Sequence, residues 1–178
     1  MDSLIKTAIW QQFGASINYL EETIKACPDS LWQAQLWQTP ADKPVELSQF
    51  WYVSYHSLFW LHCYLTGTEE GFLPHAPFEL IEQDEYGPIP QRVYIKQELL
   101  AYLIEGREKC KTTIDALTGE QARRQCTFGW GGCSFLELLI YNQRHVHGHA
   151  SQLNMLLGQN GVESPDYPTR VNRGVRVT

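Results

Sequence analysis

Three of the chain's six histidines lie within five consecutive positions, at His145, His147 and His149. On an α-helix, residues four apart project from the same side, whereas residues two apart point to opposite sides. His145 and His149 can therefore bind one ion together, and His147 cannot join them. Neutral imidazole is a common ligand of divalent transition metals, and a metal site needs at least one further ligand.

His56 is the best candidate for the third ligand, because its neighbours are almost all apolar and predict a buried helix. A single buried histidine is more often bonded to a backbone carbonyl than to a metal. With His145 and His149, however, it completes a three-histidine set of the kind that binds zinc. His62 lies six residues further on and faces another side of the helix, so we expect it at the rim, with His147 on the surface.

Several familiar classes of protein are disfavoured by missing motifs and by charge. Val146 follows His145, so the glutamate of the H-E-x-x-H zinc proteases is absent. Neither the G-x-S-x-G motif of serine hydrolases nor a phosphate-binding P-loop occurs. The formal net charge is −6, which argues against a surface that neutralises phosphates. We therefore expect no nucleic-acid partner.

The cysteines and the N-terminal residues predict a cytoplasmic protein with no membrane partner. The five cysteines are odd in number and form no C-x-x-C pair, which is typical of reduced thiols. The sequence begins without the basic and apolar regions of a signal peptide, and it holds no apolar run of about 20 residues.

Four long amphipathic segments are predicted to position the histidines. Apolar residues that recur every three or four positions indicate helices over about 5–27, 48–66, 94–117 and 134–158. Ser48 is the expected cap of the second helix, and Ser134 with Glu137 forms a capping box for the last. Residues 67–92 are rich in Gly and Pro and predict an extended crossover, and 126–133 predict a loop.

No alternating pattern suggests a sheet, so the prediction is an all-α four-helix bundle. We expect a single domain over residues 1–178, with a core over about 5–160 and an irregular C-terminal tail over 161–178. In such bundles, metal sites are built from side chains on facing helices.

Three segments of the sequence carry a family resemblance: Tyr55–Trp60, Glu98–Leu103, and Leu138–Val146 with His149. Together they resemble the DinB-like (YfiT-like) family of metalloenzymes over about residues 5–160. The resemblance implies an up-down-down-up four-helix bundle in which one histidine of the second helix and two of the last bind nickel, zinc or a similar ion. Those positions are His56, His145 and His149. Members often carry a further histidine beside the last ligand, where this chain has Gly148.

The resemblance also implies a function, since characterised relatives join a low-molecular-weight thiol to an electrophile. The first hypothesis is therefore a divalent-metal-dependent thiol S-transferase, with a metal-dependent hydrolase as a variant. A second hypothesis is a non-enzymatic dimeric bundle of the stress response that the bound metal stabilises. A third is a bundle that binds hydrophobic molecules without a metal.

The sequence identifies no catalytic side chain beyond the ligands. Tyr52, Trp60 and Asn142 are candidates to line the pocket, because each lies three or four residues from a ligand.

A homodimer is expected because Trp32, Trp37 and Trp51 suggest an exposed apolar patch and because relatives commonly form two-fold dimers. Light scattering at micromolar concentration should show a species of twice the 20.5 kDa chain mass. A monomer alone would contradict this expectation.

Overall fold

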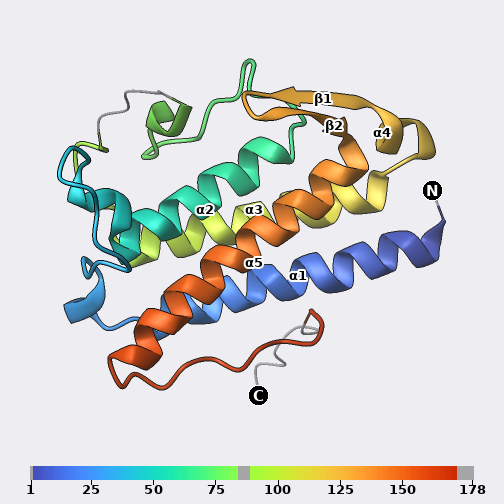
Figure 1. Cartoon of the computed structure of the whole chain (residues 1–178). Coiled ribbons are helices and arrows are strands. Elements are labelled where there is room, and N and C mark those ends of the chain that lie inside the picture. The colour runs from blue at the N-terminus through green and yellow to red at the C-terminus, as the bar shows by residue number, and fades with distance from the viewer. Residues whose placement is uncertain (1, 84–88, 172–178) are drawn as a thin grey trace.

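Four long helices lie side by side and form a bundle in the computed structural model, which describes residues 2–83 and 89–171 (Figure 1). They are α1 (Ser3–Ala26), α2 (Phe50–Tyr64), α3 (Lys96–Ala116) and α5 (Phe135–Gln159). Helices α1 and α5 run in one direction and α2 and α3 in the other, so the topology is up-down-down-up. The predicted all-α bundle is confirmed, with one small hairpin added to it.

Each long helix packs against two others, α1 and α2 each lying between α3 and α5. Fully buried apolar residues fill the space that the four helices enclose, among them Phe13, Ile17, Leu58, Leu103 and Leu153. Helix α2 is the most enclosed: every residue of it is buried except His56 and Trp60. Those two residues are one turn apart, so they mark a single strip where solvent reaches α2.

Of the two predicted helix caps, the one at α5 is confirmed and the one at α2 is wrong, while Asp2 caps α1. The Asp2 carboxylate accepts from the Leu4 amide at 2.7 Å and caps α1. At the start of α5, Ser134 N–H donates to Glu137 Oε2 at 2.8 Å, as the capping box requires. The predicted cap of α2 is wrong: Ser48 ends the 3₁₀ helix η2 (Val45–Ser48), and its hydroxyl donates to the Val45 carbonyl instead.

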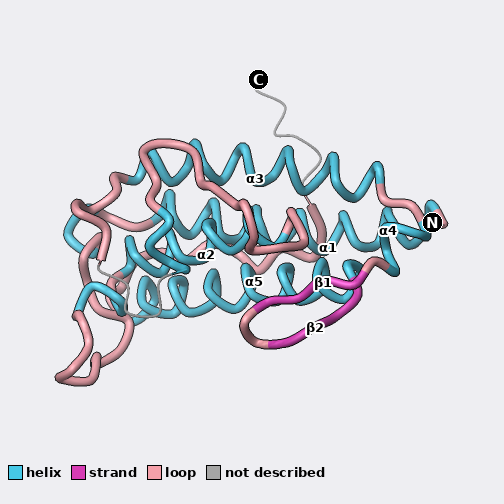
Figure 2. Tube along the Cα trace, turned by 90° about the horizontal axis from the view of Figure 1, so that it is seen from above, coloured by secondary structure: helices cyan, strands magenta, loops and turns pink. Residues whose placement is uncertain are grey.

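A two-stranded antiparallel hairpin replaces the predicted loop over 126–133 (Figure 2). Strands β1 (Gln125–Phe128) and β2 (Gly131–Ser134) follow the short helix α4 (Gly119–Arg123). The expectation of no sheet was wrong because each strand has four residues, too few to show alternation, and β2 reads Gly-Gly-Cys-Ser. The turn residues are Gly129 and Trp130 rather than an Asn-Gly or Asp-Gly pair.

The crossover between α2 and α3 runs back along the length of the bundle (Figure 1). Phe72 and Phe78 anchor it in the core, and the Tyr55 hydroxyl donates to the Glu79 carbonyl at 2.6 Å. The 3₁₀ helix η3 (Leu80–Gln83) follows directly. These anchors hold the crossover against α2, and Glu82 with it. Residues 84–88 of the predicted crossover lie outside the described residues.

The connector between α1 and α2 contains the 3₁₀ helix η1 (Asp29–Leu31), followed by a bridge between Gln35 and Gln49. Trp32 and Trp51 are buried here, whereas Trp37 is 43% exposed. Of the three tryptophans expected to form an exposed apolar patch, only Trp37 is exposed.

The described part of the C-terminal tail lies along α1 as an irregular segment. Val171 N–H donates to the Gln11 carbonyl at 2.9 Å, and Gln12 Nε2 donates to the Thr169 carbonyl at 3.2 Å. The rest of the predicted tail, 172–178, lies outside the described residues. Within the described chain, no helix combines the length and the apolar character that crossing a membrane requires.

Two helical glycines should respond in opposite ways to alanine. A Cβ at Gly106 would lie 2.9 Å from His62 Nε2 and 2.9 Å from Leu61 Cδ2, so Gly106 is needed for the close approach of α3 to α2. We expect Gly106→Ala to lower the free energy of unfolding by roughly 1–3 kcal/mol, because overpacking outweighs the gain in helix propensity.

Gly148→Ala is the matched control for this substitution. A Cβ at Gly148 meets no atom within 4 Å, so only the propensity gain of about 1 kcal/mol remains. Urea unfolding of both variants measures the two effects. Stabilisation of both variants would show that overpacking at Gly106 does not outweigh the gain in helix propensity.

Candidate metal centre

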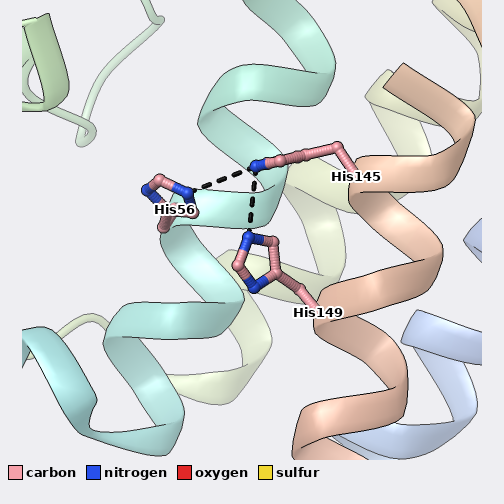
Figure 3. A group of neighbouring side chains, drawn as sticks. All are labelled: His56, His145 and His149. Carbon is pink, nitrogen blue, oxygen red and sulfur yellow. Dashed lines mark hydrogen bonds between the residues drawn. The ribbon is translucent and has the colours of Figure 1, made fainter. Parts of the chain in front are cut away.

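Three imidazoles converge between α2 and α5 (Figure 3). The Nε2 atom of His145 lies 3.3 Å from Nε2 of His56 and 3.1 Å from Nε2 of His149. His145 and His149 are one turn apart on α5, and His56 faces them from α2. The structure thus brings together the three residues that the sequence proposed as ligands.

The spacing of these nitrogens fits a divalent ion. Two ligand nitrogens about 2.0–2.1 Å from a tetrahedral zinc ion are about 3.3 Å apart. Without an ion, Nε2 of His145 could donate a hydrogen bond to only one of its two neighbours and would face a lone pair on the other. A cation at the centre would satisfy all three nitrogens at once. The donor set and its geometry can therefore hold a metal.

The outer nitrogens of two of the three rings are held by hydrogen bonds. Nδ1 of His56 lies 2.6 Å from Glu82 Oε2, and Nδ1 of His149 lies 2.8 Å from Gln152 Oε1. Both partners are acceptors, so each ring carries its proton on Nδ1 and directs the Nε2 lone pair at the centre. Histidines that bind metals are usually held in this way. Nδ1 of His145 is buried and has no partner among the described residues.

Glu82 is the component of the site that the sequence did not reveal. Its side chain is only 5% exposed, and it also accepts from Trp60 Nε1 at 3.2 Å. Burial alone would raise its pKa, but hydrogen bonding with His56, Tyr52 and Trp60 outweighs burial and lowers the pKa. Glu82 is therefore a carboxylate. It belongs to no motif, and several other acidic residues share its crossover, so nothing in the sequence singles it out.

Burial keeps two of the three candidate ligands neutral. Burial, with a smaller contribution from the neighbouring imidazoles, lowers the pKa of His145 to about 2 and that of His149 to about 4. A histidine must be deprotonated to bind a metal, so these rings are ready for an ion at neutral pH.

The three predicted pocket residues occupy different positions. Tyr52 and Trp60 flank His56 and both approach Glu82, where they support the carboxylate. Burial raises the pKa of Tyr52 well above its ordinary value, so it stays a hydroxyl. Asn142 is fully buried, and its Nδ2 donates to the Leu61 carbonyl at 3.1 Å, which ties α5 to α2.

Aromatic rings surround His145 on the side of the hairpin. The ring centroids of Tyr64 and Tyr141 lie 6.0 and 6.4 Å from that of His145. Trp130, at the tip of the hairpin, stacks on Tyr141 at 4.8 Å and is 47% exposed. This side of the centre is therefore apolar.

The remaining histidines lie away from the cluster. His62 is not at the rim, as predicted, but buried between α2 and α3, where its Nε2 lies 2.9 Å from the Tyr102 carbonyl. The expected surface residue His147 is partly buried, packed against Tyr19 and Tyr167 at centroid distances of 5.6 and 4.9 Å.

The described chain is thus a four-helix bundle with a three-histidine cluster that could hold a metal ion. Its fold is similar to that in the crystal structure of a DinB-like protein, YjoA, from Bacillus subtilis, with a TM-score of 0.61 and 17% sequence identity. The match covers 90% of this chain and 97% of that chain. No family model and no curated protein matches the sequence. At this identity the similarity shows the fold, which is DinB-like, and the predicted resemblance is confirmed at that level.

Proposed function

We propose that this protein is a divalent-metal-dependent enzyme whose ion, zinc or nickel, is bound by His56, His145 and His149. The observation that carries the proposal is the convergence of three Nε2 atoms while the Nδ1 atoms of two rings are held by Glu82 and Gln152. Imidazole sites accept several first-row metals, so the ion in the cell also reflects availability.

The arrangement favours a catalytic over a structural ion. Structural zinc sites have four protein ligands, whereas catalytic sites keep one position for water or substrate. In the described part of the chain, no fourth His, Cys, Asp or Glu joins the three histidines. The His56 side chain is 29% exposed, on the strip where solvent reaches α2. A divalent ion with an open position lowers the pKa of bound water or stabilises a substrate thiolate.

The side chains around the histidines orient two of the ligands and offer a surface for a substrate. Glu82 and Gln152 fix the orientation of His56 and His149, so the nitrogens need no rearrangement when an ion arrives. Tyr141 and the exposed Trp130 offer an apolar surface beside His145 for the organic part of a substrate.

We propose that the protein is a low-molecular-weight-thiol S-transferase. The open coordination position suits a thiolate, and the family resemblance implies this reaction.

The test uses protein purified without a His-tag or nickel column. Elemental analysis measures the bound ion, and mass spectrometry then detects adducts between a panel of small thiols and 1-chloro-2,4-dinitrobenzene. Metal-free protein from metal-replete medium would refute metal dependence. Loaded protein that hydrolyses esters but joins no thiol would instead favour the hydrolase.

Loss of Glu82 should weaken metal binding although no ligand is removed. We expect Glu82→Ala to reduce affinity for zinc about 10–100-fold, because partners of the outer nitrogen typically contribute that much. Glu82→Gln retains an oxygen that can accept from His56 and should recover most of the loss. Competition with a chromogenic chelator measures both.

Glu105→Ala is the control for Glu82→Ala. Glu105 is exposed and pairs with His75 at 2.6 Å on the crossover, away from the cluster. Its loss should leave the affinity for zinc unchanged. Equal losses in the two alanine variants would show that Glu82 does not act through His56.

A further inference from the structure

Two cysteines lie opposite each other in the hairpin. In the register of β1 and β2, Cys126 pairs with Cys133. Side chains of directly paired residues in antiparallel strands project from the same face of the sheet. The two thiols are therefore cross-strand neighbours, which the sequence could not show because it predicted a loop here.

The backbone separation of such a pair suits a disulfide. Paired Cα atoms in antiparallel strands are about 4.5–5.5 Å apart, inside the range of about 4.4–6.8 Å that disulfides span. The Cβ atoms must approach by about 1 Å, from roughly 4.5–5.5 Å to 3.5–4.5 Å. Strand β2 can supply this movement because Gly131 and Gly132 precede Cys133, and a Cβ at Gly131 would meet no atom within 4 Å.

The two thiols differ in access. Cys133 is partly exposed, whereas Cys126 is only 2% exposed. The other cysteines, Cys27, Cys63 and Cys110, are buried. Burial raises the pKa of Cys133, and the nearby Cys126 raises it further, so both groups are thiols at neutral pH and exchange through a minor thiolate fraction. A reagent from solvent therefore meets Cys133 first.

We propose that Cys126 and Cys133 are a site of reversible disulfide formation with small-molecule disulfides, RSSR. The Cys133 thiolate attacks one sulfur of RSSR, the reagent's S–S bond breaks, and the first thiol leaves with the proton that Cys133 lost. Cys126 then attacks the Cys133 sulfur of the mixed disulfide and expels the second thiol. The two cysteines are oxidised, and RSSR is reduced to two RSH.

The bond would change the hairpin that carries Trp130. Trp130 lies in the turn between the paired cysteines and stacks on Tyr141, which lies beside His145. A disulfide across the hairpin would therefore restrict the movement of Trp130, and with it the aromatic side chains beside His145. The inference does not rest on the proposed enzymatic function, because the cysteine pair is defined by the hairpin alone.

The experiment exposes the reduced full-length protein to hydroxyethyl disulfide, followed by alkylation and trypsin digestion. Gln125–Arg144 is one tryptic peptide that contains both cysteines and no internal Lys or Arg. We expect this peptide to escape alkylation and to be lighter than its reduced form by about 2 Da. Dithiothreitol should reverse both changes. A wild-type protein that keeps the reagent adduct on Cys133, or that loses a different pair of thiols, would overturn the proposal.

Two variants separate the steps. In Cys126→Ser the attack on the mixed disulfide is impossible, so the adduct on Cys133 should accumulate to roughly tenfold or more above wild type. In Cys133→Ser the buried Cys126 should stay unmodified. An adduct on Cys133 that is equally abundant in wild type and in Cys126→Ser would contradict the inference.

Discussion

Replacing His145 or His149 by alanine should reduce the affinity for zinc by more than about a hundredfold, since loss of a ligand costs more than loss of a residue that only orients one. His145 is the more informative position because its Nε2 contacts both other nitrogens. Its removal leaves only His56 and His149, one ligand short of the three-histidine set. Titration with cobalt, read by its visible absorption, measures affinity and coordination together.

His147→Ala is the internal control for these ligand variants. His147 lies on the same helix, two residues from each α5 ligand, but it packs on Tyr19 and Tyr167 on the other side of α5. Its loss should leave the metal content near that of wild type. Full occupancy in His145→Ala, or a loss in His147→Ala as large as in His149→Ala, would rule out the site.

Lowering the pH from 7 to about 4.5 should strongly destabilise the metal-free protein. Burial lowers the pKa of His145 to about 2 and those of His149 and His62 to about 4. Below about pH 6.5 the unfolded chain binds protons that the folded chain does not, so stability present above that pH is lost as the pH falls. The slope approaches about 1.4 kcal/mol per pH unit for each of these histidines.

Urea unfolding at pH 7, 6 and 5 measures this loss before most carboxylates titrate. His62→Gln is the matched variant because His62 is buried between α2 and α3, outside the cluster. It should reduce the pH dependence by about one third and leave the contribution of His145 and His149. A stability that stays constant between pH 7 and 5 would show that these rings are not held neutral by burial.

The clustering of His56, His145 and His149 could be predicted from the sequence, because local geometry determines most of it. The four-residue spacing of His145 and His149 needs only a helix, and that helix carries a capping box at Ser134 and Glu137. Pairing with His56 needs the bundle topology as well, which the family resemblance implied. Four stripes of apolar residues predicted the bundle. The two short strands were missed because neither is long enough to show the alternation of apolar and polar residues that indicates a strand.

Glu82 could not be found in the same way. Its position depends on where Phe72, Phe78 and Tyr55 anchor the crossover, and those contacts are tertiary. The burial of His62 has a similar origin, since it depends on the close approach of Gly106 of α3 to the imidazole ring. The positions of Glu82 and His62 thus depend on contacts between secondary-structure elements, which no pattern within a single helix or loop reveals.

The candidate centre joins segments that are far apart along the chain, since His56 and His145 are 89 positions apart. An ion bound there would act as a removable cross-link between α2 and α5, because it binds only when the bundle is assembled. At a free-ion concentration about 1,000 times Kd, this linkage stabilises the fold by about 4 kcal/mol. Melting curves recorded across a panel of divalent ions would therefore rank the metals by affinity, with no substrate in hand.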